Sequence, residues 1–299
     1  MSLDRRKFLS LSALSTATIL APSTMAEHEE QVNPDAMAVL VDTVVCIGCR
    51  KCEWACNRSN ELTDNSMSSF EDKSVFEEHR RPNRDAYTVV NKFTAPEEPE
   101  KAYQIKVQCM HCLKPACVSA CIVGALEKTP EGPVVYDAWK CMGCRYCMVA
   151  CPFQIPAYEY DEALAPEVKK CSFCYERVVK EGKLPACKEI CPNEALTFGT
   201  RTELLDIAHS RIKNFPDKYY DHVYGEFEVG GTSWLYLTPT DFRNTELPDV
   251  GKDAGPNITE PIQHGIFKSF VPPLALYGLL GLAMHQFKGE KEEKAEDQE

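Results

Sequence analysis

Cysteine is the residue type in this sequence whose number and spacing could do chemistry. The chain has 299 residues and 16 cysteines, which is too many to explain as buried thiols in an ordinary cytosolic enzyme. The cysteines form four groups of four with none left over, here called quartets 1 to 4. In chain order these are Cys46, Cys49, Cys52 and Cys56; Cys109, Cys112, Cys117 and Cys121; Cys141, Cys144, Cys147 and Cys151; and Cys171, Cys174, Cys187 and Cys191.

The spacing within the quartets predicts iron–sulfur clusters. Quartets 1 and 3 follow C-x2-C-x2-C-x3-C, and Pro152 comes directly after quartet 3. In this pattern a tight turn directs three thiolates at one cubane cluster, and the fourth cysteine, at the start of a helix, ligates the neighbouring cluster. Quartets 2 and 4 follow C-x2-C-x4-C-x3-C and C-x2-C-x12-C-x3-C. We therefore expect the sixteen cysteines to bind the iron of four 4Fe–4S clusters.

Two other uses of the cysteines compete with clusters. Disulfide bonds are the usual role of an even number of cysteines in a small exported chain, but pairing does not explain four tight quartets. Zinc fits quartet 4, whose C-x2-C and C-x3-C pairs resemble a zinc ribbon. Zinc explains quartets 1 and 3 poorly, because a zinc site needs only pairs of cysteines. A zinc- or disulfide-stabilised binding module without redox activity stays open as the alternative class.

The rest of the sequence contains no motif for catalysis. There is no C-x-x-C-H for a covalent haem, and no G-x-G-x-x-G or P-loop for a nucleotide. We expect no catalytic residue, and clusters without an open iron position pass single electrons. This predicts a non-catalytic electron-transfer subunit of an oxidoreductase. The net charge of −12 argues against a nucleic-acid partner, and a hydrophobic content of 44% excludes a disordered chain.

The elements that must position the cysteines are short strands and helices. Residues 125–128 and 133–136 predict a hairpin, residues 195–199 repeat its first strand, and residues 103–108 alternate like a strand. Residues 202–214 predict a helix capped by Thr202, with one apolar face made of Leu205, Ala208 and Ile212. The aromatic stretch at 219–236 suits either core packing or docking on a partner.

Both ends of the chain carry segments outside the predicted fold. Residues 1–26 contain paired arginines, a short apolar run and a small-residue cleavage site, which indicates a twin-arginine signal peptide. Residues 266–287 include nineteen uncharged residues in a row, close to the length of about 20 that crosses a bilayer. We expect a single-pass anchor there, with a buried helix as the alternative, followed by a charged tail at 288–299.

The residues around the cysteines resemble a known family. The matching stretches are 108–112, 115–121, 141–153, 170–174, 184–187, 198–204, 224–226 and 230–232. They resemble the four-cluster iron–sulfur subunits of formate dehydrogenase, dimethyl sulfoxide reductase and polysulfide reductase. The likeness is greatest to the exported, membrane-anchored iron–sulfur subunit of the quinone-reducing uptake nickel–iron hydrogenase. It covers nearly the whole mature chain, and residues 57–107 match least.

The resemblance implies a fold and a set of ligands. The fold would be α+β, with tandem ferredoxin-like domains related by a pseudo-twofold over residues 27–200, an insertion at 57–107, an extension at 201–265 and a transmembrane helix. In that family quartet 1 pairs with quartet 4, and quartet 2 with quartet 3. The implied ligand sets are set A, Cys46, Cys49, Cys52 and Cys191; set B, Cys56, Cys171, Cys174 and Cys187; set C, Cys109, Cys112, Cys117 and Cys151; and set D, Cys121, Cys141, Cys144 and Cys147.

The resemblance also implies partners and a location. The chain would connect a hydrogenase-like or molybdenum-containing, formate dehydrogenase-like catalytic subunit with a membrane quinone-reactive or cytochrome subunit. It would lie on the periplasmic face of the bacterial inner membrane. An iron–sulfur subunit of a multihaem cytochrome–quinone complex is the alternative within the same class.

Overall fold

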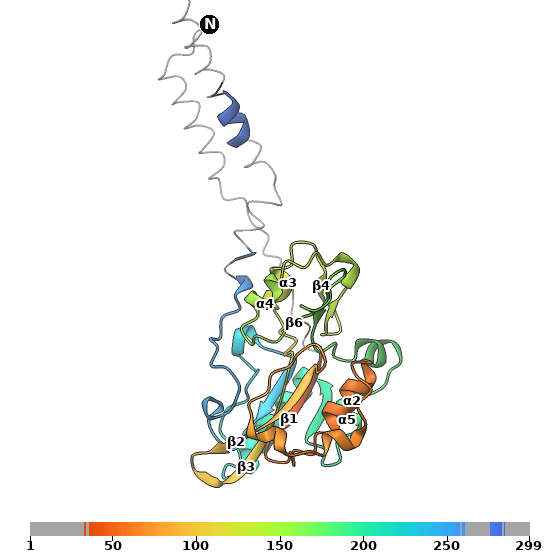
Figure 1. The fold of residues 1–299 in the computed structure, drawn as a ribbon. Helices are drawn as coiled ribbons and strands as arrows, with labels where there is room; N and C mark the ends of the chain where they lie inside the picture. The colour runs from red at the N-terminus through yellow and green to blue at the C-terminus, as the bar shows by residue number, and fades with distance from the viewer. Residues whose placement is uncertain (1–32, 34–35, 258, 261–275, 283, 285–299) are drawn as a thin grey trace, which may run out of the picture. The chain divides into compact units, whose positions relative to one another are not determined.

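The computed structural model describes residues 33, 36–257, 259–260, 276–282 and 284 (Figure 1). Residues 32–257 form one compact unit of the chain. The predicted signal peptide lies outside the described residues, and of the predicted anchor only 276–282 and 284 lie within them. No helix in the described part of the chain is long and apolar enough to cross a membrane.

A three-stranded sheet forms the centre of the unit at 32–257. Its order is β8 (Leu196–Thr200), β1 (Met37–Asp42) and β9 (Trp234–Leu237), with β1 antiparallel to β8 and parallel to β9. Both faces of β1 are buried, because Val39 and Val41 join the core that includes Cys109, Cys171 and Cys187 while Ala38 and Leu40 pack toward α6. A strand buried on both faces reads as a continuous apolar run, as β1 does.

The quartets lie at the ends of two antiparallel strand pairs. Strand β1 leads into quartet 1, and β8, which follows quartet 4, pairs with it. Strand β4 (Leu126–Lys128) follows quartet 2 and pairs with β5 (Val134–Tyr136), which leads into quartet 3. The helices pair in the same way, α2 (Lys51–Ser59) with α5 (Ala186–Glu189) and α3 (Ala116–Ser119) with α4 (Tyr146–Ala150) (Figure 1). The hairpin predicted at 125–136 is confirmed.

Helix α6 (Arg201–Asn214) covers one face of the sheet, and it corrects two details of the prediction. The cap is Thr200 and not Thr202: its side chain accepts a bond from the Glu203 N–H while the Glu203 carboxylate accepts one from the Thr200 N–H. This capping box begins the helix one residue earlier. The buried face is Leu204, Ala208 and Ile212, so Leu204 takes the place predicted for Leu205.

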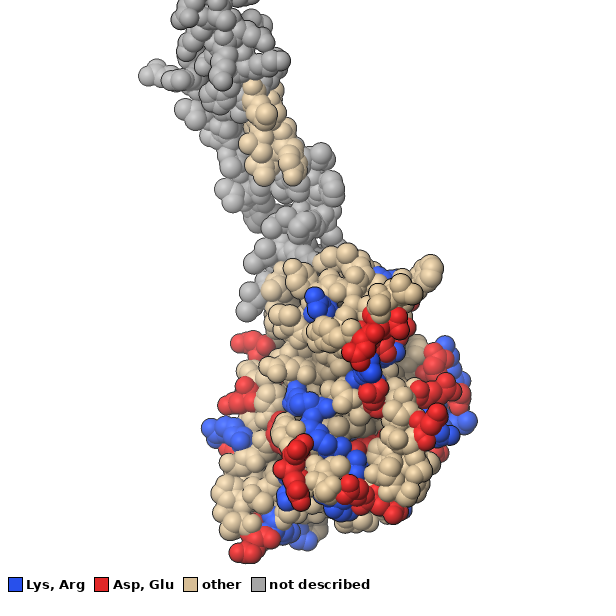
Figure 2. All heavy atoms as spheres, in the orientation of Figure 1, with Lys and Arg blue, Asp and Glu red and all other residues tan. Residues whose placement is uncertain are grey.

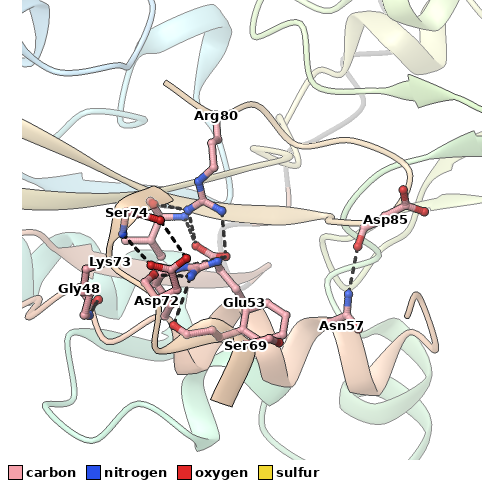
Figure 3. Close-up of polar contacts among 12 residues, drawn as sticks. Gly48, Glu53, Asn57, Ser69, Asp72, Lys73, Ser74, Arg80 and Asp85 are labelled. Atoms are coloured by element: carbon pink, nitrogen blue, oxygen red, sulfur yellow. Dashed lines mark hydrogen bonds and ion pairs between the residues drawn. The ribbon is translucent and has the colours of Figure 1, made fainter. Parts of the chain in front are cut away.

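The insertion at 57–107 folds back onto quartet 1. Its long strands β2 (Thr88–Ala95) and β3 (Glu98–Gln108) form an antiparallel hairpin in which Val90 faces Lys106. The buried Glu53 of α2 joins the insertion to the quartet, since it accepts bonds from Arg50, from Arg80 at 2.7 Å and from the Val90 N–H at 2.7 Å (Figure 3). A buried carboxylate with three charged or polar donors is satisfied, and losing one partner would be costly.

The remaining elements are short. They are the 3-10 helices η1 (Met67–Phe70), η2 (Ser74–Glu77), η3 (Ala138–Lys140), η5 (Glu228–Gly230) and η6 (Phe242–Asn244), the π-helix η4 (Glu176–Lys180), and the paired strands β6 (Ala157–Tyr158) and β7 (Val168–Lys169).

Candidate functional site

Quartets 1 and 3 share one backbone turn. Gly48 and Gly143 have φ of 63° and 73°, and Arg50 and Arg145 adopt left-handed conformations with φ of 60° and 62°. An L-residue rarely takes this conformation, so its occurrence at the same place in both loops shows that the shared spacing requires it. The helices begin directly after these arginines. The fourth cysteine of each quartet therefore lies inside α2 or just after α4, and not at a helix start as predicted.

Two cavities are each lined by cysteines from two different quartets. One is lined by Cys46, Cys49, Cys52 and Cys191, which are the members of set A. The other is lined by Cys56, Cys171, Cys174 and Cys187, which are the members of set B. Cys56 thus lies with three cysteines of quartet 4, although it belongs to quartet 1 in the sequence.

The thiols of sets A and B lie close enough to raise one another's pKa. Burial raises the pKa of Cys46, and the Cys191 and Cys49 thiolates raise it further. Burial likewise raises the pKa of Cys56 well above its usual value, and so do the thiolates of Cys171, Cys187 and Cys174. Buried thiolates that repel each other become stable when a metal core is bound between them.

The thiols of sets C and D are grouped in the same way. Burial, followed by the thiolates of Cys109, Cys117 and Cys151, raises the pKa of Cys112. In set D burial raises the pKa of Cys147 to about 11, with further contributions from Cys141, Cys121 and Cys144. Each of these groups again contains cysteines from both quartet 2 and quartet 3.

The four sets follow one another in a row. Three pairs of thiols interact across set boundaries, and each pair joins one set to the next. The pairs are Cys52 with Cys187 between sets A and B, Cys171 with Cys109 between sets B and C, and Cys117 with Cys147 between sets C and D. The spatial order is therefore A, B, C, D, and it differs from the order of the quartets along the chain.

Disulfide bonds and zinc sites are the two alternatives to clusters. All sixteen cysteines are free thiols. Among the described residues, no three His, Cys, Asp or Glu side chains converge on the position of one metal ion.

Unpartnered buried donors accompany the thiols, and they test whether a sulfide-rich group would fit. Trp234 lines the set B cavity, and its Nε1 is buried without a hydrogen-bond partner in the described part of the molecule. His111 lies between Cys109 and Cys112, and its Nδ1 accepts a bond of 2.9 Å from the Val134 N–H, which leaves the proton on Nε2. That Nε2 also lacks a partner among the described residues. Buried donors are normally satisfied, so the Trp234 donor at the set B cavity suits a group rich in sulfur acceptors.

The surroundings of the four sets differ. The insertion hairpin and the central sheet line parts of the set A and set B cavities, whereas Cys144 of set D is exposed. Large apolar side chains near set D face solvent, with Trp139 96% and Val149 85% exposed. Figure 2 shows few charged side chains where α3, α4 and β4 lie, and mixed charges over the rest of that face. An exposed apolar surface of this kind favours contact with a partner.

The other sites considered from the sequence have structural roles. In the aromatic stretch at 219–236, Tyr224, Trp234 and Tyr236 are almost completely buried in the main core. This confirms core packing for these three rings.

Sequence reasoning missed the buried lysines beside the cysteines. Lys106, Lys128 and Lys170 have thiolates as electrostatic neighbours, and Lys106 and Lys170 are almost fully buried. Lys106 occupies a polar position in an alternating strand, which ordinarily faces water. Its one sequence signal was that the strand leads directly into quartet 2.

Part of the chain matches a known protein family. A family model described as a 4Fe–4S dicluster domain matches residues 101–201. That range contains quartets 2, 3 and 4 and ends where α6 begins.

Whole-chain relatives extend the match beyond this range. The chain is 35% identical to the hydrogenase-2 operon protein HybA of Escherichia coli O157:H7, over 99% of this chain and the full length of that protein. It is 30% identical to the nitrate-inducible formate dehydrogenase iron–sulfur subunit of Escherichia coli K12, over 100% of this chain and 99% of that one. It is also 45% identical to a protein of Nitratidesulfovibrio vulgaris, over 98% of this chain and 80% of that one.

Proposed function

Because the chain belongs to the family of 4Fe–4S iron–sulfur subunits of hydrogenases and formate dehydrogenases, we propose that it relays electrons through four clusters between a catalytic and a membrane subunit. Sets A, B, C and D would each hold one 4Fe–4S cluster through their four thiolates. When bound, the clusters accept and release single electrons. The observation that carries this proposal is the mixing of quartets around each cavity.

The protein's own residues prepare these sites. Arg50 and Arg145 have left-handed backbones within their loops, and this turn would direct three thiols of each loop at one cluster. Helices α2 and α5 contact each other and carry two members of set B, Cys56 from quartet 1 and Cys187 from quartet 4. Burial lowers the local dielectric and limits the access of water, which affects the potential of a bound cluster.

The row of sets suggests two ends for the relay. Set D lies at one end with exposed apolar neighbours, and we assign this end to a contact with a partner subunit. Set A lies at the other end. A hydrogenase-like or formate dehydrogenase-like catalytic subunit at one end and a membrane subunit at the other would complete the path. Co-purification from membranes tests the partners, and recovery of a multihaem cytochrome in place of a catalytic subunit would reject this pairing.

Iron analysis of paired variants tests the ligand sets. The full-length protein should contain about 16 iron atoms and as many acid-labile sulfides. Cys56→Ala with Cys171→Ala removes two ligands of set B and should cost about four iron atoms. Cys56→Ala with Cys52→Ala removes two cysteines of quartet 1, one from set B and one from set A. This variant should lose about eight iron atoms. Equal losses from the two double variants, or bound zinc with little iron, would reject the proposed sets.

Export and anchoring form a separate part of the proposal. The paired Arg5 and Arg6 support export by the twin-arginine route to the periplasmic side. Replacing both by lysine should keep the protein in the cytoplasm. Leu276, Leu279 and Leu280 are exposed apolar residues within the proposed anchor, and deleting residues 269–287 should release the protein from membranes. Continued membrane binding of that deletion in the absence of partner subunits would reject the anchor.

A further inference from the structure

Lys106 is a buried lysine that lies beside two of the candidate cluster cavities. It belongs to β3 of the insertion hairpin, and only 3% of the residue is exposed. The residue lines both the set A cavity and the set B cavity. Among the described residues, no other lysine lines either cavity. Its position therefore distinguishes it from the surface lysines of the chain.

The protein partners of the Lys106 ammonium are neutral. Its Nζ donates to Gln108 Oε1 at 2.9 Å and lies 4.4 Å from the centre of the Trp234 ring. Gln108 Nε2 donates to Tyr236 Oη at 2.6 Å, and Tyr236 Oη donates to the Lys106 carbonyl at 2.8 Å. Within the described part of the chain no carboxylate forms an ion pair with Lys106. An ammonium buried without a counter-charge is strongly destabilising, so its compensation must come from another source.

The two cavities that Lys106 lines are the proposed positions of the clusters of sets A and B. A cluster bound in either cavity would supply the negative charge that the protein does not place beside the ammonium. Set A lines one cavity and set B lines the other, so one cation lies beside both sets.

We propose that Lys106 is a shared counter-charge for sets A and B and raises the reduction potentials of both clusters held there. This inference rests on the proposed four-cluster function. A 4Fe–4S core with four thiolates carries a net charge of about −2 when oxidised, and reduction adds one more negative charge. A nearby positive charge stabilises the reduced form more than the oxidised form. Because the lysine lies beside both cavities, its effect reaches two clusters at once.

Replacement of the lysine by methionine tests the proposal. Lys106→Met removes the charge with little change in side-chain volume. In the full-length, cluster-loaded protein, a redox titration followed by electron paramagnetic resonance should shift two cluster signals to lower potential and leave two unchanged. Lys106→Arg keeps the charge and should retain the wild-type potentials. Unchanged potentials in Lys106→Met, or an equal downward shift in Lys106→Arg, would overturn the proposal.

Lys128→Met provides a matched control. Lys128 Nζ donates to the His111 carbonyl at 3.0 Å, and His111 lies between Cys109 and Cys112 of set C. This variant should shift a different signal from the two that respond to Lys106→Met. A shift in the same two signals would show that any buried lysine affects the whole row, and would reject a local role for Lys106.

A third variant covers the case in which Lys106→Met binds less iron. Gln108→Glu leaves the lysine in place and puts a carboxylate beside its ammonium, which should lower the same two potentials. No shift in a fully loaded Gln108→Glu protein would overturn the proposal. The iron content of the unmodified protein tests the four-cluster function separately. Four clusters with potentials that do not respond to these variants would reject the role of Lys106 alone.

Discussion

The loops of quartets 1 and 3 have one spacing and one backbone turn, yet they lie in different surroundings. Arg50 is buried and bonded to Glu53, whereas the equivalent Arg145 is exposed and lies over the rings of Tyr158 and Tyr160. Cys49 is partly buried, and the equivalent Cys144 is exposed. The comparison shows that local spacing determines the turn, while segments distant in sequence determine how much solvent reaches it.

The insertion explains the difference. Lys73 donates to the Gly48 carbonyl, and the side chains of Gln104 and Phe76 lie against Gly48. Gly143 instead meets the hydroxyl of Tyr158, which comes from the short β6. The covered loop suits a site that keeps solvent out, and the open loop suits a site that exchanges electrons with another subunit.

The largest difference between the two loops should appear when clusters are removed. Solvent reaches Cys144 of set D most readily, so mild oxidation with a chelator should first remove about four of roughly 16 iron atoms. Timed iron analysis with electron paramagnetic resonance would follow the loss. The early signal should be the one abolished in Cys144→Ala. Loss of the signal abolished in Cys49→Ala at the same rate would remove the distinction between covered and open loops.

Glu53 should carry most of the stability that the insertion gives to quartet 1. Glu53→Ala leaves the buried Arg50 without its partner and should lower the free energy of unfolding by about 3–5 kcal/mol. Met148 occupies the same position in quartet 3 and is half-buried, so Met148→Ala should cost less than about 2 kcal/mol. Urea unfolding of the cluster-loaded proteins, followed by tryptophan fluorescence, compares the two. Equal losses would mean that the insertion does not stabilise its loop.

The two glycines test the part of the loops that is alike. Alanine at φ near 60–70° costs about 1–2 kcal/mol, and at Gly48 and Gly143 the new Cβ would also lie 2.7 Å from another side chain. Both variants should therefore lose stability to a similar degree. Gly124 has φ of 64° and nothing within 4 Å, so Gly124→Ala measures the backbone cost alone. If Gly48→Ala or Gly143→Ala loses no more stability than Gly124→Ala, the loop with that glycine does not contain the strained turn.

Much of this arrangement follows from the sequence, because it is set by local geometry. The 125–136 hairpin, the strand ending at Gln108 and the helix ending at Asn214 form as expected. The helix start differs by one residue. Both Thr200 and Thr202 are residues that cap helices well, and Thr200 is the cap because it forms a capping box with Glu203.

What sequence patterns could not supply depends on long-range contacts. Lys106 shares its strand face with Gln104 and Gln108, a pattern typical of a solvent-facing surface. Lys106 and Gln108 are nevertheless buried, because the insertion hairpin lies against the cavities of sets A and B. Likewise, nothing in the spacing of quartet 1 indicates that Glu53 would accept bonds from Arg80 and Val90 of the insertion.

The smallest effect on the protein itself should come from the exposed apolar side chains around set D. Trp139→Ser and Val149→Ser alter residues that are 96% and 85% exposed, so each should change the free energy of unfolding by less than about 0.5 kcal/mol. If this open end binds a partner subunit, the same variants should reduce the amount of partner that co-purifies from membranes. Phe215→Ser, at an exposed apolar position after α6, is the control and should leave recovery unchanged. Loss of the partner from Phe215→Ser but not from Trp139→Ser would move the contact away from set D. If Trp139→Ser and Val149→Ser leave the free energy of unfolding unchanged but reduce the amount of partner recovered, these side chains belong to a docking surface. A covered core, such as the one around quartet 1, would instead lose stability on substitution.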